Sequence, residues 1–158
     1  MVRMTRKLRT VLVVAAVAVG LPLAALALGS SDEGTGVAGD ALWQAIVTEE
    51  SKGNPAAYNR EEEAAGIVQI RPICLEDVNR ISRSRGLGLK FTSADRFSPE
   101  KSRKMWEIYL MHYSEKYTAE TGRRPTDETF ARIWNGGPTG WRKLSAKDYW
   151  TRVQGNIK

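Results

Sequence analysis

The stretch EESKGNP, residues 49–55, closes an expected amphipathic helix that begins near residue 40. Successive residues of a helix are rotated by about 100°, so Glu50 projects between Ile46 and Val47 on the apolar face. Glu49 projects to the edge of the same face. The pattern therefore predicts that Glu50 points into the protein, whereas Glu49 stays near its surface.

The same stretch predicts the end of this helix. Gly53 is the expected C-terminal cap, and Pro55 cannot continue the helix. Glu50 then lies in the last turn, near the negative end of the helix dipole. The apolar face and the dipole both disfavour the ionised carboxylate, so we expect a raised pKa and a role as general acid. The alternative is a helix-end glutamate that turns out to water.

The N-terminal residues have the pattern of an export signal. Four basic residues within positions 1–10 precede an apolar run over residues 11–28, and the small-residue pattern of a signal-peptidase site follows at residues 25–27. We expect a signal peptide over residues 1–29 and export to the periplasm or another extracytoplasmic space. Because the run is longer than most signal cores, an uncleaved membrane anchor is the alternative. Residues 30–39 read as a linker to a catalytic domain over residues 40–158.

The charge of the chain gives little support for nucleic-acid binding. The chain has 24 Lys and Arg against 18 Asp and Glu, a net charge of +6, but the leader holds four of the basic residues and no acidic one. The remainder therefore has 20 basic and 18 acidic residues, a net charge of +2. Residues 71–104 stay basic, with nine basic and four acidic residues. Such a run is typical of a solvated face, although it could attract an anionic polymer.

Single residues limit the remaining chemistry. Cys74 is the only cysteine, so an intrachain disulfide is impossible and the exported domain must rely on its core. His112 is the only histidine and has no cysteine nearby, so neither a zinc site nor a Ser-His triad is supported. We therefore expect no metal and no cofactor, and a monomeric protein.

Helical periodicity and capping residues predict an all-α domain with short loops. The expected helices cover residues 40–52, 72–82, 98–120 and 127–134, and a last helix begins at residue 145. The third of these carries an apolar and aromatic stripe and is the expected central core helix. Ile73 is expected on the apolar side of the second helix. Residues 135–138 are expected to form a tight turn, since they contain two glycines and a proline.

The expected helix starts are marked by capping residues. Ser98 and Thr126 are the expected N-caps of the third and fourth helices. Ser145 is expected to cap the last helix through a capping-box variant, with Leu144 packed on Tyr149 as a hydrophobic staple.

Three segments carry inward polar groups that secondary structure does not require. They are Glu50 with Ser51, Gln69 within the apolar residues 66–70, and Asn135 between a tryptophan and two glycines. A buried amide must find hydrogen-bond partners, and each amide alone could satisfy backbone groups. Together with a poised carboxyl group, they indicate a pocket for a polar substrate that carries amides.

These segments resemble the three ordered signatures of the soluble lytic transglycosylase-like catalytic domain, which read roughly E-S-x-x-[ND]-P, G-L-M-Q-x-x-P and A-Y-N. The corresponding stretches are ESKGNP at residues 50–55, GIVQIRP at 66–72 and WNGG at 134–137. The family is related to goose-type lysozyme and has a lysozyme-like helical fold. The resemblance covers residues 41–153 and implies a small lysozyme-like domain that cleaves peptidoglycan between N-acetylmuramic acid and N-acetylglucosamine.

The resemblance also implies roles for individual residues. Glu50 matches the single catalytic acid/base of the family, and Ser51 matches the serine that orients the substrate or the acid. Gln69 matches the glutamine that lines the sugar site, and Asn135 matches the asparagine that contacts the substrate. Trp134 stands where the family usually has tyrosine, which exchanges a hydroxyl for an indole N–H.

Other positions concern glycan preference. Tyr58, in the loop that follows the first helix, is a further candidate for substrate binding. Val68 replaces the usual methionine, and the loop that contains Glu61, Glu62 and Glu63 is more acidic than is usual in the family.

Two further readings share the expected fold. A hydrolytic muramidase needs a second carboxylate to position water, and two-carboxylate glycosidases hold the pair within about 10 Å. Glu61, Glu62 and Glu63 are the candidates for that role. A catalytically silent wall-binding or scaffold module is the other reading, and the presence of Glu50, Gln69 and Asn135 together disfavours it.

Overall fold

The computed structural model describes residues 38–158, so the expected leader and most of the expected linker lie outside the described residues. The described chain contains the helices α1 (Asp40–Ser51), α2 (Pro72–Ser84), α3 (Pro99–Thr121), α4 (Asp127–Gly136) and α5 (Ser145–Gly155), and the 3-10 turns η1 (Ser93–Phe97) and η2 (Gly140–Arg142). The strands β1 (Tyr58–Asn59) and β2 (Ala64–Ala65) form a small antiparallel hairpin. The all-α prediction is confirmed.

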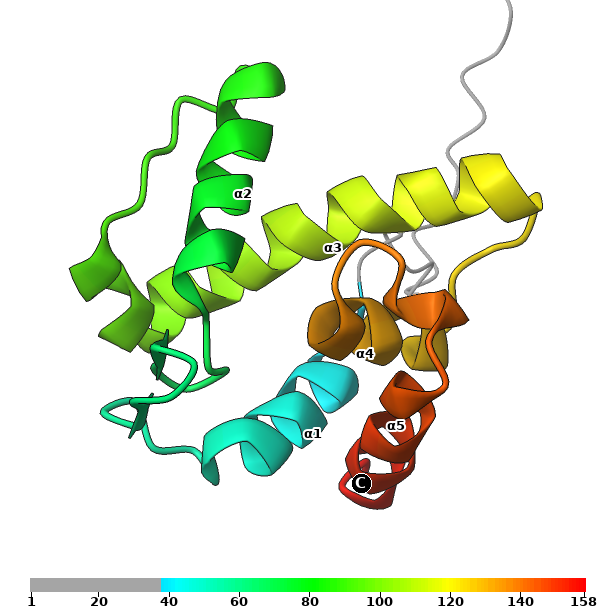
Figure 1. The fold of residues 1–158 in the computed structure, drawn as a ribbon, viewed down its shortest axis with the longest axis horizontal. Coiled ribbons are helices and arrows are strands. Elements are labelled where there is room, and N and C mark those ends of the chain that lie inside the picture. Colours follow the sequence, from blue (N-terminus) through cyan, green and yellow to red (C-terminus); the bar gives the residue numbers. More distant parts are fainter. Residues whose placement is uncertain (1–37) are drawn as a thin grey trace, which may run out of the picture. The chain divides into compact units, whose positions relative to one another are not determined.

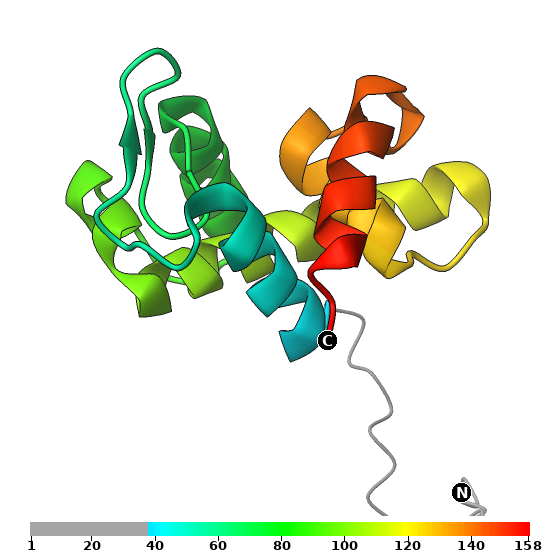
Figure 2. The same ribbon diagram turned by 90° about the horizontal axis from the view of Figure 1, so that it is seen from below.

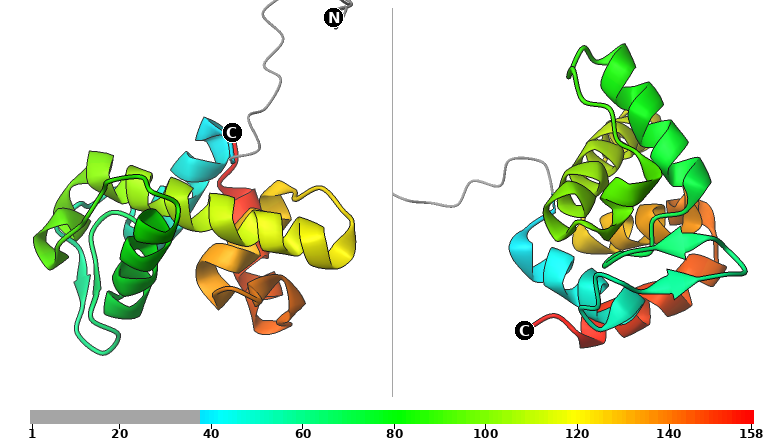
Figure 3. Two further views of the ribbon diagram at one scale, coloured as in Figure 1. Left: turned by 90° about the horizontal axis from the view of Figure 1, so that it is seen from above. Right: turned by 90° about the vertical axis from the view of Figure 1, so that its left-hand side faces the viewer.

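Helix α3 is the central element, as the sequence predicts. It runs through the middle of the described structure. Helix α2 and the hairpin lie toward one of its ends, and α4 and α5 lie toward the other (Figures 1, 2 and 3). Met105, Trp106 and Leu110 are fully buried along its inner face. The Trp106 ring packs edge-on against Trp43 of α1, with 5.2 Å between ring centroids. The aromatic stripe of α3 is therefore core, and it joins the two ends of the molecule.

Several predicted helix ends are confirmed. The Ser98 hydroxyl caps α3 by accepting a hydrogen bond from the Lys101 N–H, and the Thr126 hydroxyl caps α4 by accepting one from the Thr129 N–H. Gly122, with a φ of 69°, ends α3. These positions follow local rules that a sequence displays directly.

Two predicted ends are wrong by one or two residues. Lys52, not Gly53, caps α1: it takes a φ of 55°, and its N–H donates to the carbonyl of Thr48. Helix α4 continues through Gly136, because Gly137, with a φ of 80°, still donates its N–H to Ile133. Asn135 therefore lies in the last helical turn rather than in a separate tight turn.

Helix α5 begins at Ser145 as predicted, but its predicted capping is wrong. Leu144 occupies the cap position with helical dihedral angles, and no side chain caps the helix. Leu144 is 77% exposed, so it does not form a staple with the buried Tyr149. The turn η2 leads into α5 with the backbone already helical, and this approach directs the leucine outward.

The predicted place of Ile73 is wrong as well. The inner face of α2 is supplied by Leu75, Val78 and Ile81, whereas Ile73 is 71% exposed. Residues 73 and 75 are about 200° apart around a helix, so Leu75 and Ile73 cannot face the core together.

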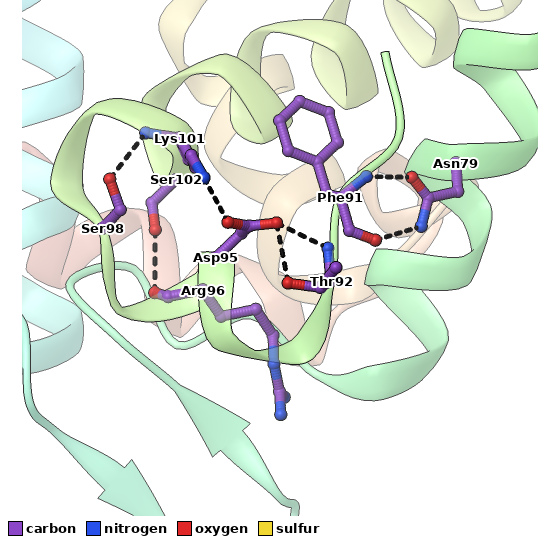
Figure 4. Close-up of polar contacts among 8 residues, drawn as sticks. All are labelled: Asn79, Phe91, Thr92, Asp95, Arg96, Ser98, Lys101 and Ser102. Atoms are coloured by element: carbon purple, nitrogen blue, oxygen red, sulfur yellow. Dashed lines mark hydrogen bonds and ion pairs between the residues drawn. The ribbon is translucent and has the colours of Figure 1, made fainter.

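The segment between α2 and α3 is more ordered than the loop that the sequence predicts (Figure 4). Thr92 and Asp95 form a reciprocal capping box at the start of η1. The Asn79 side chain bonds both the N–H and the carbonyl of Phe91, at 2.8 and 2.9 Å, and so ties the segment to α2. The result is a fixed support for the hairpin loop.

Arg96 of η1 connects this segment to the loop between α1 and α2 by hydrogen bonds. Its buried guanidinium donates to the carbonyls of Glu63 and Ile70, at 2.7 and 2.9 Å. Gly66, with a φ of +81°, passes so close that an added Cβ would lie 1.7 Å from the Arg96 carbonyl oxygen. Only glycine fits there, because the conformation and the available space both exclude a side chain.

Candidate active site

A groove with a volume of about 710 Å³ gathers residues from all three sequence motifs. Its lining includes Glu50 at the end of α1, Gln69 before α2, and Trp134 and Asn135 at the end of α4. A groove of this size is typical of sites for small molecules or short polymer segments. The structure thus brings together four of the six predicted site residues.

Glu50 is the poised acid of this groove. Its Oε1 accepts a hydrogen bond of 2.7 Å from the Tyr149 hydroxyl of α5. Burial raises the pKa of Glu50 to about 7, the bond from Tyr149 opposes the rise, and the charges of Glu49 and Glu62 add to it. The expected rise in pKa is confirmed. A carboxyl group that is half protonated near neutral pH can give a proton in one step and take one in the next.

Glu49 takes a different direction, as its place on the helix predicts. Its carboxylate pairs with Arg152 of α5. It is absent from the lining of the groove. The two neighbouring glutamates therefore have separate surroundings, one in the groove and one in an ion pair at the surface.

Ser51 connects the end of α1 to the second motif. Its hydroxyl donates to the carbonyl of Ile67 at 2.7 Å, and Ser51 does not line the groove. This bond fixes residues 66–70 relative to the neighbouring Glu50. In the described structure, Ser51 acts on the geometry of the acid's surroundings.

Gln69 has an unusual backbone and a fixed side chain. Its φ is 51°, in the left-handed region that costs a non-glycine residue about 1–3 kcal/mol. Its Nε2 donates to the carbonyls of Gly66 and Ala57, at 2.9 and 3.3 Å. The amide nitrogen is thus committed to the loop, and the side chain is held against the groove.

The third motif closes the groove from the α4 side. Trp134 is buried, and its ring meets Tyr109 of α3 edge-on with 5.8 Å between centroids. Asn135 follows on the exposed side of the last helical turn. Tyr58 lies on β1, is 50% exposed and does not line the groove.

Tyr149 is the site residue that the sequence analysis missed. It is predicted to pack inward in α5, but its contact with Glu50 is not predicted. A signal existed, because a buried tyrosine hydroxyl usually needs a hydrogen-bond partner. Nothing in the sequence identifies that partner, since the two residues meet only when α5 packs beside α1.

Other chemistry is limited within residues 38–158. No group of three or more His, Cys, Asp and Glu side chains is placed to hold a metal ion in this part of the chain. Cys74 lines the groove, and burial raises the pKa of its thiol to about 12, so it remains protonated. Over the same residues, no helix combines the length and apolar character needed to cross a membrane.

The fold is that of the lysozyme-like class. The structure matches the crystal structure of Tapes japonica lysozyme with a TM-score of 0.56, at 22% sequence identity, over 73% of this chain and 88% of that one. The sequence matches the Transglycosylase SLT domain family over residues 38–152, and the chain belongs to that family.

A local match accompanies these global ones. Lysozyme 1 of Crassostrea virginica is 45% identical over 42 residues, which are 27% of this chain and 23% of that protein. The aligned segment spans about a quarter of the length of that relative.

Proposed function

We propose that the protein is a peptidoglycan lytic transglycosylase that cleaves the β-1,4 bond between N-acetylmuramic acid and N-acetylglucosamine. The observation that carries the proposal is the partly buried Glu50, bonded to Tyr149, in a groove that Gln69 and Asn135 also line. Membership of the Transglycosylase SLT domain family supports the same reaction class. The partner is the glycan strand of the cell wall, and the proposal includes no metal or cofactor.

Glu50 supplies both proton transfers in the proposed mechanism. The protonated carboxyl group gives its proton to the leaving glycosidic oxygen. The acetamido oxygen of muramic acid then stabilises the cation-like anomeric carbon. The ionised Glu50 takes the proton from the C6 hydroxyl of the same sugar, whose oxygen bonds to the anomeric carbon. This closure is intramolecular, and well-oriented groups reach very high effective concentrations.

The products identify the reaction. Purified peptidoglycan is digested with the mature protein, and the soluble fragments are examined by mass spectrometry. The proposal predicts 1,6-anhydromuramic ends, lighter by one water than hydrolysis products. Predominantly reducing muramic ends would contradict the proposal. Intact peptidoglycan after prolonged digestion would support a silent wall-binding or scaffold module.

A hydrolytic muramidase is the second candidate, and one observation favours it. Glu62 lines the same groove as Glu50, and its negative charge contributes to the raised pKa of Glu50. Its partner is Arg71, at a distance of 3.8 Å between exposed side chains. Among the three candidate carboxylates of the sequence, Glu62 alone lines this groove, so it is the residue that would position water.

Substitution of the two neighbouring acids separates the candidates. If the protein is a hydrolase, Glu62→Gln lowers the yield of reducing ends by about 10²-fold or more, whereas Glu61→Gln leaves it unchanged. If it is a lytic transglycosylase, both variants keep forming anhydro ends at nearly the wild-type rate.

Export follows from the same proposal, because the substrate lies outside the cytoplasm. We propose that the mature chain begins near residues 28–30 and acts in the periplasm or another extracytoplasmic space. N-terminal sequencing of protein from that fraction tests this step. An intact Met1 in the membrane fraction would favour an anchor, and an intact Met1 on soluble cytoplasmic protein would contradict export.

A further inference from the structure

The groove extends beyond the acid along one face of α2. Ile73, Glu76, Asp77 and Arg80 all line it. Their spacing of i, i+3, i+4 and i+7 places them in one stripe of the helix. At 1.5 Å of rise per residue, the stripe is about 10 Å long, which is the length of about three extended residues. Part of the groove therefore has a wall of charged side chains and one exposed isoleucine.

Asp77 and Arg80 form a fixed, internally balanced pair. The Arg80 Nε donates to Asp77 Oδ1 at 2.8 Å, and the Tyr113 hydroxyl of α3 donates to Asp77 Oδ2. Burial, helped by the bond to Asp77, raises the pKa of Tyr113 to about 12, so Tyr113 remains a donor. The pair forms this part of the groove wall. Its two charges largely neutralise each other, so they offer little to a ligand.

Glu76 and Lys143 differ from that pair. Glu76 is exposed, and no other residue of the described chain forms an ion pair or a hydrogen bond with its carboxylate. Lys143, from the segment between η2 and α5, also lines the groove, and within residues 38–158 its ammonium group has no ion-pair partner. The groove thus offers one acidic and one basic group to a ligand.

The sugars of the proposed substrate offer no ionised partner to the charged groups of the groove. Both sugars are N-acetylated, and the lactyl carboxyl of muramic acid is consumed in the amide bond to its peptide. The ionised groups of peptidoglycan are the amines and carboxylates of that peptide. Hydroxyl and acetamido groups of the glycan can form hydrogen bonds with Glu76 and Lys143, but only the peptide offers them a partner of opposite charge.

We propose that the α2 stripe is a subsite for the peptide attached to muramic acid, with Glu76 binding a free amine of that peptide. Ile73, 71% exposed in the first turn of α2 and part of the groove lining, supplies apolar contact to the peptide. This inference rests on the proposed cleavage of peptidoglycan. It adds that the α2 stripe makes the protein prefer strands whose peptide carries a free amine. Glu76 is a specificity residue, since it does not contact the reacting atoms.

Three substrates test the subsite. They are purified peptidoglycan with free amines, the same material with its amines acetylated, and glycan strands stripped of peptide by an amidase. For the wild-type protein, acetylation lowers kcat/KM by about 2- to 5-fold, the size of an exposed ion pair. Glu76→Gln lowers kcat/KM on unmodified peptidoglycan by the same factor and shows no further loss on the acetylated material.

A control variant accompanies the test, and different outcomes contradict the subsite and the proposed function. Glu100→Gln, an exposed substitution in the first turn of α3 away from the groove, keeps the wild-type sensitivity to acetylation. Equal rates of the wild-type protein on free and acetylated amines, or an equal loss for Glu76→Gln on all three substrates, would overturn the subsite. If the wild-type protein releases no fragment from any substrate, the proposed function itself fails, and the subsite falls with it.

Discussion

The hydroxyl of Tyr149 donates a hydrogen bond of 2.7 Å to Oε1 of Glu50, across 99 positions of the sequence. Burial raises the pKa of Tyr149 well above its usual value of 10, so Tyr149 stays protonated while it contacts the acid. Burial also raises the pKa of Glu50, and the bond from Tyr149 limits that rise. The last helix therefore sets the pH range in which the acid of the first helix holds its proton.

Tyr149→Phe is expected to move this range upward. Without the hydroxyl, the ionised Glu50 loses its hydrogen bond, and its pKa rises further. The first step of the proposed mechanism needs protonated Glu50, so the alkaline limb of the pH profile of kcat/KM is expected to shift to higher pH. Tyr117→Phe, which removes the hydroxyl of a partly buried tyrosine packed against the core, leaves the limb unchanged. An unshifted limb in Tyr149→Phe would contradict the role of the bond.

Glu50→Gln is expected to lower wall lysis by about 10²–10⁴-fold, the usual contribution of a general acid. The amide is nearly isosteric and can still accept the bond from Tyr149, so the fold is retained. Glu49→Gln keeps most of the activity, because Glu49 pairs with Arg152 outside the groove. Turbidity loss of purified cell walls measures both variants. An equal loss in the two would show that the wrong glutamate has been assigned.

Glu50→Gln is also expected to stabilise the protein at alkaline pH. The pKa of Glu50 is about 7 in the folded protein against 4.5 without the fold, so the folded state binds the proton more tightly. The stability from this group is complete below pH 4.5 and is lost as the pH rises through 7. The ionised, buried carboxylate then costs about 3 kcal/mol.

Denaturant unfolding at two pH values measures this effect. Glu50→Gln should exceed the wild type in free energy of unfolding by up to about 3 kcal/mol at pH 8, and by little at pH 4. A constant difference between the two pH values would mean that burial does not shift the titration of Glu50.

Gly66→Ala is expected to destabilise the protein by more than about 3 kcal/mol. Its Cβ would lie 1.7 Å from the Arg96 carbonyl oxygen, and its φ of +81° is unfavourable for alanine. Gly86→Ala is the matched control, because Gly86 has a φ of +65° with no atom within 4 Å of the added Cβ. It should cost about 1 kcal/mol, from the backbone alone. Equal losses in thermal or denaturant unfolding would show that the hairpin loop moves freely away from Arg96.

The sequence predicts those parts of the fold that depend on local rules. The face of α1, the caps at Ser98 and Thr126 and the stripe of α3 follow from periodicity and from side chains that bond their own helix. The capping of α5 does not, because η2 determines how the chain enters that helix. The prediction for Ile73 is wrong although periodicity could have corrected it, since residue 73 is about 200° from Leu75 around the helix.

The residues of the candidate site also divide into those predicted from local motifs and those that depend on contacts between distant segments. Glu50, Gln69 and Asn135 lie in short motifs, so the sequence identifies them, and the structure brings them into one groove. Tyr149, Arg96 and the α2 stripe act only through contacts between distant segments. Arg96 in particular reads as one more charge of a basic run, since its bonds go to backbone carbonyls that no sequence pattern displays.

The contact between Glu50 and Tyr149 also has a consequence for the synthesis and folding of the chain. A ribosome makes Tyr149 99 residues after Glu50. A chain truncated before α5 retains all three motifs but lacks the helix that packs beside α1 and bonds the acid. Glu50 therefore gains its hydrogen bond only after α5 has been made and has packed beside α1.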